Sequence, residues 1–235
     1  AGNDTIIGGA GNDTITGEGG VDIITGAGGS DTISLGSSDS SIDVVNFNTS
    51  TGTDTILQFN AGSSNGDIMK YAGNLANGGS SNTTNGSDNN DDLVSVDFKS
   101  SSKNLSLDID HLVITFNTAV TQNGLTSGST IDFTGAGVSS SQILGAIETS
   151  LENKNDGSGS GLLSGSSNQQ VLQANSNVSQ LLLFTDGGSG SNEDIALVLY
   201  NESSSSDLDF GGELTLTNII KGIDITTLTH DNFWG

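Results

Sequence analysis

The 235-residue chain carries 28 Asp and Glu against five Lys, which gives a formal net charge of −23. This charge excludes nucleic acid as a partner, because phosphate binding needs clustered Lys and Arg, and it makes cations the natural counterions of a self-repelling chain. The absence of Cys excludes disulfide scaffolds and thiolate metal sites, and no apolar stretch approaches the roughly 18 residues typical of a transmembrane helix.

Residues 1–34 repeat one nonapeptide in a single register: AGNDTII, GGAGNDTIT, GEGGVDIIT and GAGGSDTIS. The unit is G-G-x-G-x-D-x-U-x, where U is a large apolar residue, and it is an established signature of a calcium-binding parallel β-helix. In every unit Ile follows Asp by two positions. We therefore predict a short strand with an inward Ile in each unit, and two units in each coil of 18 residues.

The six residues before each predicted strand turn the chain, and Gly adopts the positive φ of tight turns without steric cost. Backbone carbonyls can then face the gap between coils, where Asp adds the hard anionic oxygen that calcium prefers. We expect Asp13 to share an ion gap with the loop of Asp31. The same spacing pairs Asp4 with the loop of Asp22, and it offers a further ion gap between the Asp22 loop and the turn at 35–39. The predicted calcium set is Asp4, Gly8, Ala10, Gly11, Asp13, Gly17, Gly19, Gly20, Asp22, Gly26, Gly28, Gly29, Asp31 and Asp39.

The next segment is expected to close the repeat array. Residues 40–47 and 53–59 read as strands, and 60–71 as a turn running into a short strand. Residues 72–91 are low in complexity and read as a loop. The chain begins in mid-repeat and without Met, so we expect it to be a piece of a longer protein.

The rest of the chain predicts mainly strands and one helix. Between 92 and 135 the strand candidates are LVSVDF, LSLDI, HLVITF and STIDF, and after 171 they are QLLLF, DIALVLY and ELTLTNI. A helix is predicted at 140–152, where Ile143, Ile147 and Leu151 share one face. Residues 153–170 read as a second loop.

These elements predict a mainly β protein. A calcium-binding parallel β-roll (1–39) precedes roll-closing strands (40–71), a β-rich insertion with loops and the helix (72–180), and a C-terminal β cap (181–235). We expect the C-terminal region to be β-sandwich-like.

No catalytic motif is found, so we predict that the chain is not an enzyme. His111 and His230 do not form an HExxH motif, and no G-x-S-x-G elbow is present. Acidic pairs such as Asp108 and Asp110 are typical of solvated strand charges. Asp186, Glu193 and Asp194 in TDGGSGSNED offer a further possible calcium site without the spacing of an EF-hand loop.

With these motifs the sequence resembles the RTX family of bacterial secreted proteins. The closing segment fits the family pattern through Asp43, Phe47, Asp54 to Phe59 and Asp67-Ile68, and the C-terminal ending fits from Leu228-Thr229 to Phe233. The resemblance implies export from a Gram-negative cell by type I secretion machinery through an uncleaved C-terminal secretion signal within residues 181–235. It also implies folding outside the cell when calcium binds.

We therefore expect a calcium-dependent folding and secretion module of a large extracellular structural protein, either a surface-layer protein or an adhesin, that is secreted or held at the bacterial cell surface. Abundant Ser, Thr, Asn and Gly support this reading, and calcium could then also promote self-association into a surface array. The alternative is the C-terminal tail of a secreted enzyme, such as a metalloprotease, a lipase or a polysaccharide-modifying enzyme.

Overall fold

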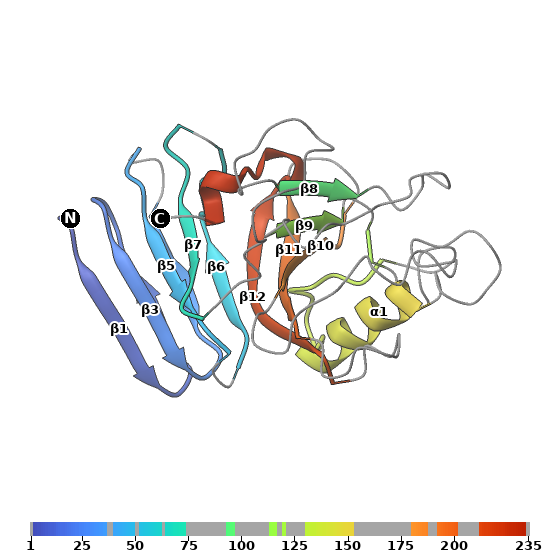
Figure 1. Cartoon of the computed structure of the whole chain (residues 1–235). Helices are drawn as coiled ribbons and strands as arrows, with labels where there is room; N and C mark the ends of the chain where they lie inside the picture. Colours follow the sequence, from blue (N-terminus) through green and yellow to red (C-terminus); the bar gives the residue numbers. More distant parts are fainter. Residues whose placement is uncertain are drawn as a thin grey trace.

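The N-terminal part of the chain is a stack of short parallel strands in two facing sheets (Figure 1). The structure is a computed structural model and describes residues 2–36, 40–49, 52–62, 64–73, 93–96, 113–116, 119–120, 130–152, 180–187, 192–201 and 212–233. The first sheet contains β1 (Thr5–Ala10), β3 (Ile23–Gly28), β5 (Val44–Phe47) and β7 (Ile68–Tyr71) in that order. The second begins with β2 (Thr14–Thr16), β4 (Thr32–Ser34) and β6 (Asp54–Leu57).

The pairing register confirms the predicted coil. Ile6 lies opposite Ile24 in the first sheet, and Ile15 lies opposite Ile33 in the second. Both pairs are 18 residues apart, so each coil consists of two nonapeptides. Ile15, Ile24 and Ile33 are buried between the sheets, as the repeat predicts.

The C-terminal strands extend the second sheet of the roll. β12 (Leu214–Ile223) pairs parallel with β6, and β11 (Glu193–Tyr200) and β10 (Gln180–Thr185) follow it in antiparallel order. β9 (Val113–Phe116) and β8 (Leu93–Val96) complete the eight-stranded sheet. The protein is thus mainly β, and its expected β-rich C-terminal region is continuous with the roll.

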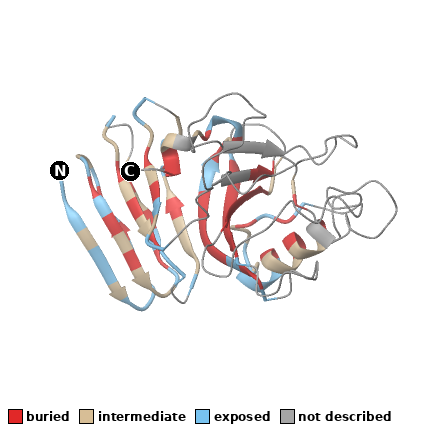
Figure 2. Ribbon diagram, viewed as in Figure 1, coloured by how far each residue is buried: buried red, intermediate tan, exposed pale blue. Residues whose placement is uncertain are grey.

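Both faces of the C-terminal strands are covered. Leu182, Phe184 and Val198 pack on one face with helix α1 (Ser140–Glu152), whereas Leu181 and Leu197 belong to the cluster that fills the roll. β10 and β11 are buried along their whole length, and Figure 2 shows β12 mostly buried, while β1 at the outer edge is mostly exposed. The short helices η1 (Ile225–Thr227) and η2 (His230–Phe233) add Ile225 and Phe233 to the roll core.

The helix forms where it was predicted, because Ser139 and Gln142 make a reciprocal cap. Ser139 Oγ accepts from the Gln142 N–H (3.3 Å), and Gln142 Oε1 accepts from the Ser139 N–H (2.9 Å). Ile143 and Ile147 are buried as expected, while the side chain of Leu151 lies outside the described part. Within the described ranges, no helix is long and apolar enough to cross a membrane.

One predicted strand is wrong. The segment STIDF (129–133) supplies two buried side chains, Ile131 and Phe133, but the described chain forms only an isolated bridge at Thr130. The backbone turns at Asp132, whose side chain accepts the Thr134 N–H and whose carbonyl accepts the Gly135 N–H. This local Asp–Gly turn overrides the strand signal of alternating apolar residues. The predicted strand LSLDI lies outside the described residues.

Candidate calcium sites

Aspartates from successive coils form two rows, one at each edge of the roll. In the first row the N–H of Asp4 donates to Oδ1 of Asp22 (2.8 Å). The N–H of Asp22 donates to Oδ1 of Asp43 (2.8 Å), and that of Asp43 to Oδ1 of Asp67 (2.9 Å). Asp22, Asp43 and Asp67 thus each use one carboxylate oxygen to hold the preceding coil.

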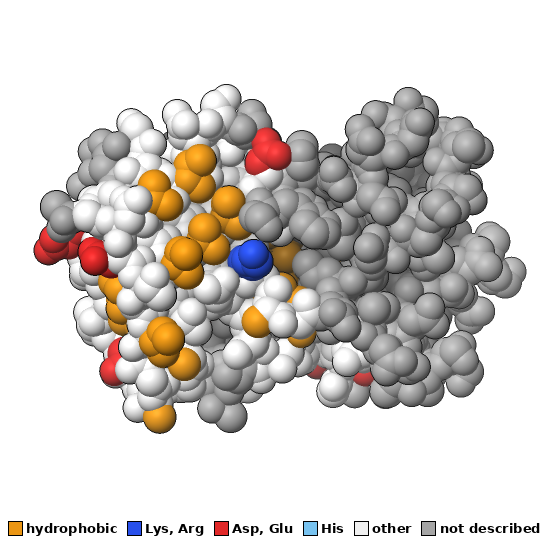
Figure 3. All heavy atoms as spheres, turned by 60° about the vertical axis from the view of Figure 1, so that its left-hand side comes forward, with side chains coloured by type: hydrophobic (Ala, Val, Ile, Leu, Met, Phe, Trp, Pro, Cys, Tyr) orange, Lys and Arg blue, Asp and Glu red, His pale blue; other side chains and the backbone are white. Residues whose placement is uncertain are grey.

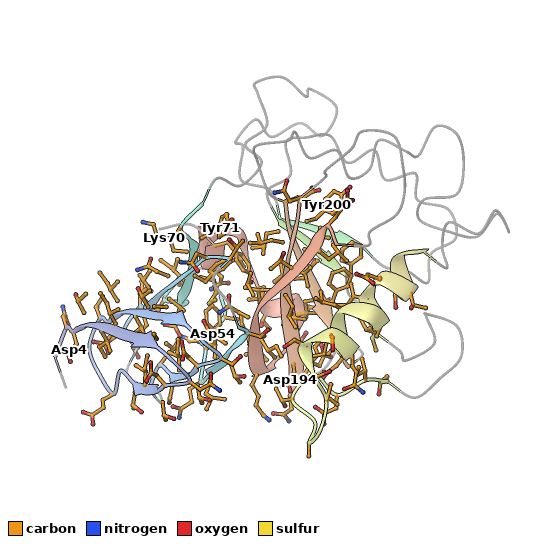
Figure 4. The ribbon with its side chains drawn as sticks, turned by 90° about the horizontal axis from the view of Figure 1, so that it is seen from below. Asp4, Asp54, Lys70, Tyr71, Asp194 and Tyr200 are labelled. Carbon is orange, nitrogen blue, oxygen red and sulfur yellow. The ribbon has the colours of Figure 1, made fainter. Side chains whose placement is uncertain are left out.

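The second row follows the same rule at the other edge. The N–H of Asp13 donates to Oδ1 of Asp31 (2.8 Å), and the N–H of Asp31 donates to Oδ1 of Asp54 (3.0 Å). Figure 4 shows Asp4 at the outer edge of the roll and Asp54 close to the C-terminal strands. The two rows therefore run through the stack of coils toward the extended sheet.

The second carboxylate oxygens of three aspartates are buried without a hydrogen bond. These are Oδ2 of Asp13, Asp22 and Asp31. Leaving a buried acceptor unsatisfied costs about 1–3 kcal/mol, and more when the group is charged. A hard cation with oxygen ligands would satisfy these atoms, so the residues present fit a calcium ion at each of them.

The first Gly of each unit is required by this arrangement. A Cβ at Gly17 would lie 2.7 Å from Asp22 Oδ2 and 3.2 Å from the Leu35 carbonyl oxygen. A Cβ at Gly26 would lie 2.3 Å from Asp31 Oδ2. Each unpartnered oxygen therefore points across the turn at the first Gly of its own unit, where a side chain would fill the space.

The fourth Gly of each unit turns the backbone. Gly11, Gly20 and Gly29 have φ of 108°, 117° and 117°. A Cβ at Gly29 would also lie 2.3 Å from the Gly11 carbonyl oxygen of the neighbouring coil. Position four therefore needs Gly both for its dihedral angle and for the close stacking of coils.

The second position of the repeat unit accepts residues other than Gly. Gly9 has φ of 111°, while Glu18 and Ala27 stand at the equivalent positions with φ of 70° and 78°. These two residues pay the steric cost of the left-handed region. Glu18, which stands where the repeat unit has Gly, therefore leaves the turn in place.

The predicted calcium residues are brought together to different degrees. Asp22 and Asp31 are buried, Asp13 is half-buried and Asp4 is exposed at the outer coil. The carbonyls of Gly19 and Gly28 accept backbone bonds from Gly2 and Gly11 of the neighbouring coil, both at 2.7 Å. Ala10 ends β1, and Asp39 lies outside the described residues. The assignment of individual calcium ligands stays a prediction.

Three members of the rows were expected only in the closing segment and not as calcium residues: Asp43, Asp54 and Asp67. Each is followed two positions later by a buried Val, Ile or Met, as in the repeat. Their separations along the rows are 21, 23 and 24 residues instead of 18. The Asp-x-apolar signal is present, but the irregular spacing hides it.

Asp54 carries an electrostatic cost in the absence of an ion. Burial raises the pKa of Asp54 to about 6, and the charge of Asp31 adds to the rise. The hydrogen bond from the Asp31 N–H acts in the opposite direction. A cation beside this carboxylate would favour its charged form.

The first row ends in hydrogen bonds. Asp67 Oδ2 accepts the Asn60 N–H (2.7 Å). Asn232 donates from Nδ2 to the Asp67 carbonyl (2.9 Å), while its Oδ1 accepts the N–H groups of Gly62 (3.2 Å) and Thr229 (2.9 Å). The C-terminal segment thus caps this row with a fully satisfied asparagine.

A third acidic group lies beside α1. One ligand atom from each of Asp132, Asp186 and Asp194 lies within 4.8 Å of the others. Asp186 accepts the N–H groups of Phe133 (3.0 Å) and Asp194 (2.9 Å), and Asp194 Oδ1 accepts the Gly222 N–H (3.0 Å). Glu193, which the sequence suggested as a third member with Asp186 and Asp194, does not belong to this group. Its carboxylate accepts a hydrogen bond from Thr185 Oγ1 (2.8 Å). These contacts give the group a role in joining turns to strands.

Comparison with known proteins supports calcium as the ion. A family model for the RTX calcium-binding nonapeptide repeat matches residues 1–33 in four copies. No match was found among curated proteins or solved structures. The repeats bind calcium and support an RTX-type protein, a family generally exported by type I systems to the cell exterior or surface.

Proposed function

We propose that this region is a calcium-dependent folding and type I secretion module of a large extracellular structural protein. The observation that carries the calcium-dependent step is the set of buried, unpartnered Oδ2 atoms on Asp13, Asp22 and Asp31. Without a cation these oxygens are desolvated and surrounded by like charge. Calcium binding therefore supplies folding free energy to the coil stack.

This coupling suits export. Extracellular calcium sites commonly bind at roughly 0.1–1 mM, so the chain stays unfolded where free calcium is low and folds where calcium is abundant. Circular dichroism of the chain with calcium and with excess chelator tests this step. We expect β-sheet signal to appear with calcium and to be lost with chelator, and an unchanged spectrum would refute the proposal.

An exposed apolar face supports a structural role in a surface array. Ile7, Val21 and Ile23 are 69%, 44% and 42% exposed. On the outer face of the first sheet, Ile23 lies opposite the half-buried Val44, and Val44 lies opposite the half-buried Ile68. Figure 3 shows hydrophobic side chains gathered on this face of the roll. Contiguous exposed apolar side chains are typical of association surfaces.

The alternative is an RTX tail attached to a secreted enzyme. In that case calcium folds the region into a monomer, and catalysis belongs to another part of the protein. Electron microscopy of the calcium-loaded chain separates the two functions. Ordered sheets or filaments support the structural protein, whereas dispersed particles at high concentration favour the enzyme tail.

A further inference from the structure

The second aspartate row continues beyond the repeats to an asparagine of the C-terminal sheet. β12 pairs parallel with β6 and places Asn218 directly opposite Asp54. Two residues further on, Ile220 lies opposite Ile56, and both side chains are buried in the roll core. Since residues two apart on a strand share a face, Asn218 and Asp54 both face the roll interior.

The side chain of Asn218 is buried and has no partner. The residue is 0% exposed, and neither Oδ1 nor Nδ2 makes a hydrogen bond in the described structure. An amide buried in this way loses its hydration without compensation, which costs about 1–3 kcal/mol for each unsatisfied group. Such a residue needs a ligand or a structural reason.

Asn232 provides an internal comparison. It ends the first row as Asn218 ends the second, but its Oδ1 and Nδ2 are occupied by backbone groups of Gly62, Thr229 and Asp67. The first row is therefore closed by protein atoms alone. The second row ends on a buried amide whose oxygen accepts no hydrogen bond from the described residues.

The carboxylates of the second row favour a hard cation as the ligand of Asn218. Oδ2 of Asp13 and Asp31 in the same row are also buried and unpartnered, and strands in a sheet repeat about every 4.8 Å. Asp54 brings a half-buried carboxylate to the same face as Asn218. Amide and carboxylate oxygens are calcium ligands, and a water molecule would leave the Asp54 charge without a counterion.

We propose that a calcium ion binds between the carboxylate of Asp54 and Oδ1 of Asn218, as the terminal site of the second row. This inference rests on the proposed calcium-dependent folding of the roll. The site joins β6 of the roll to β12, whose sequence lies far from the repeats. Calcium then stabilises the attachment of the C-terminal strands as well as the coils themselves.

Calcium stoichiometry measured by isothermal titration calorimetry on the full chain tests the site. Asn218→Leu keeps similar volume and removes the amide oxygen, so we expect it to bind one calcium ion per chain fewer than the wild type. Asn46→Leu is the matched control, because Asn46 lies on the outer face of β5 and bonds to Thr25 Oγ1 at 3.4 Å. We expect its stoichiometry to be unchanged.

A second variant separates a calcium site from a simple hydrogen bond between Asn218 Nδ2 and Asp54. Asn218→Asp adds a charged ligand, so at saturating calcium we expect a folded chain with wild-type stoichiometry and about tenfold tighter binding at one site. If Asn218 served only as a donor to Asp54, this variant would place two like charges together. It would then stay destabilised at saturating calcium, and that result would overturn the proposal.

Failure of this inference is distinct from failure of the proposed function. If the wild type neither folds with calcium nor binds it, the calcium-dependent module itself is wrong. If the wild type folds with calcium and Asn218→Leu folds with the same number of ions, the terminal site alone is wrong. In that case a water molecule or repacking satisfies the amide.

Discussion

Asp22 donates its backbone N–H to Oδ1 of Asp43 at 2.8 Å, across a separation of 21 residues. The Oδ1 of Asp22 in turn accepts the N–H of Asp4, while its Oδ2 is buried without a partner. The carboxylate is thus divided between two tasks. One oxygen fixes the distance between coils, and the other is left for an ion.

This division predicts the effect of removing charge at Asp22. Asp22→Asn keeps an oxygen for the Asp4 N–H but loses the anionic ligand, so folding should require at least about tenfold more calcium, since ligand charge tunes calcium affinity. Asp4→Asn is the matched control in the same row. Because Asp4 is exposed at the outer coil, its shift should be smaller.

The measurement is the calcium concentration at the midpoint of the circular dichroism transition. Equal shifts for Asp22→Asn and Asp4→Asn would mean that burial in the row has no influence on the site. The interpretation of the unpartnered Oδ2 atoms would then fail.

The regular part of this site was predictable from the sequence, because a fixed period of nine determines which residues stack. The pairing of Asp4 with Asp22 and of Asp13 with Asp31 follows directly from it. Asp43 and Asp54 were assigned only to the closing segment, because longer turns shift their spacing. The position of Asn218 beside Asp54 was out of reach. It depends on which distant strand covers the open edge of β6, and no local pattern encodes that choice.

Replacing Gly by Ala should lower the free energy of unfolding by different amounts at different positions of the repeat unit. Gly26→Ala would place a Cβ 2.3 Å from Asp31 Oδ2, so the carboxylate must move out of the space in which an ion is expected. We expect the free energy of unfolding of the calcium-loaded chain to fall by about 1–3 kcal/mol, as for overpacked sites.

Gly9→Ala is the control for backbone strain. A Cβ at Gly9 meets nothing within 4 Å, and only its φ of 111° opposes the substitution. Since Ala27 occupies the equivalent position, we expect a loss of about 1 kcal/mol or less. Urea unfolding at saturating calcium gives both values, and a larger loss for Gly9→Ala would contradict the packing argument.

The apolar face of the first sheet predicts the direction of changes in self-association. Ile23→Thr removes apolar area from this face and should weaken association of the calcium-loaded chain. Thr5 is exposed and lies opposite Ile23 on β1, so Thr5→Ile should strengthen it. Sedimentation velocity across a concentration series measures both, and identical distributions for the two variants would exclude this face as the contact.

The acidic group beside α1 predicts a pH dependence with an unusual sign. Burial raises the pKa of Asp186 above its ordinary 3.8, and the charges of Asp194 and Asp132 add to the rise against hydrogen bonds from the Asp194 and Phe133 N–H groups. The folded state therefore binds the carboxyl proton of Asp186 more tightly than the unfolded state does. The contribution of Asp186 to the free energy of unfolding should fall as the pH rises from 3.8 through the folded pKa.

Asp186→Asn isolates that contribution, because its amide is neutral at every pH and its oxygen can still accept one of the two N–H groups. The measured quantity is the difference in free energy of unfolding between wild type and Asp186→Asn at saturating calcium, from pH 4 to 7. We expect the wild type to lose stability relative to the variant as the pH rises. A relative gain would show that a cation neutralises Asp186 together with Asp132 and Asp194, because an ion there would favour the charged carboxylates.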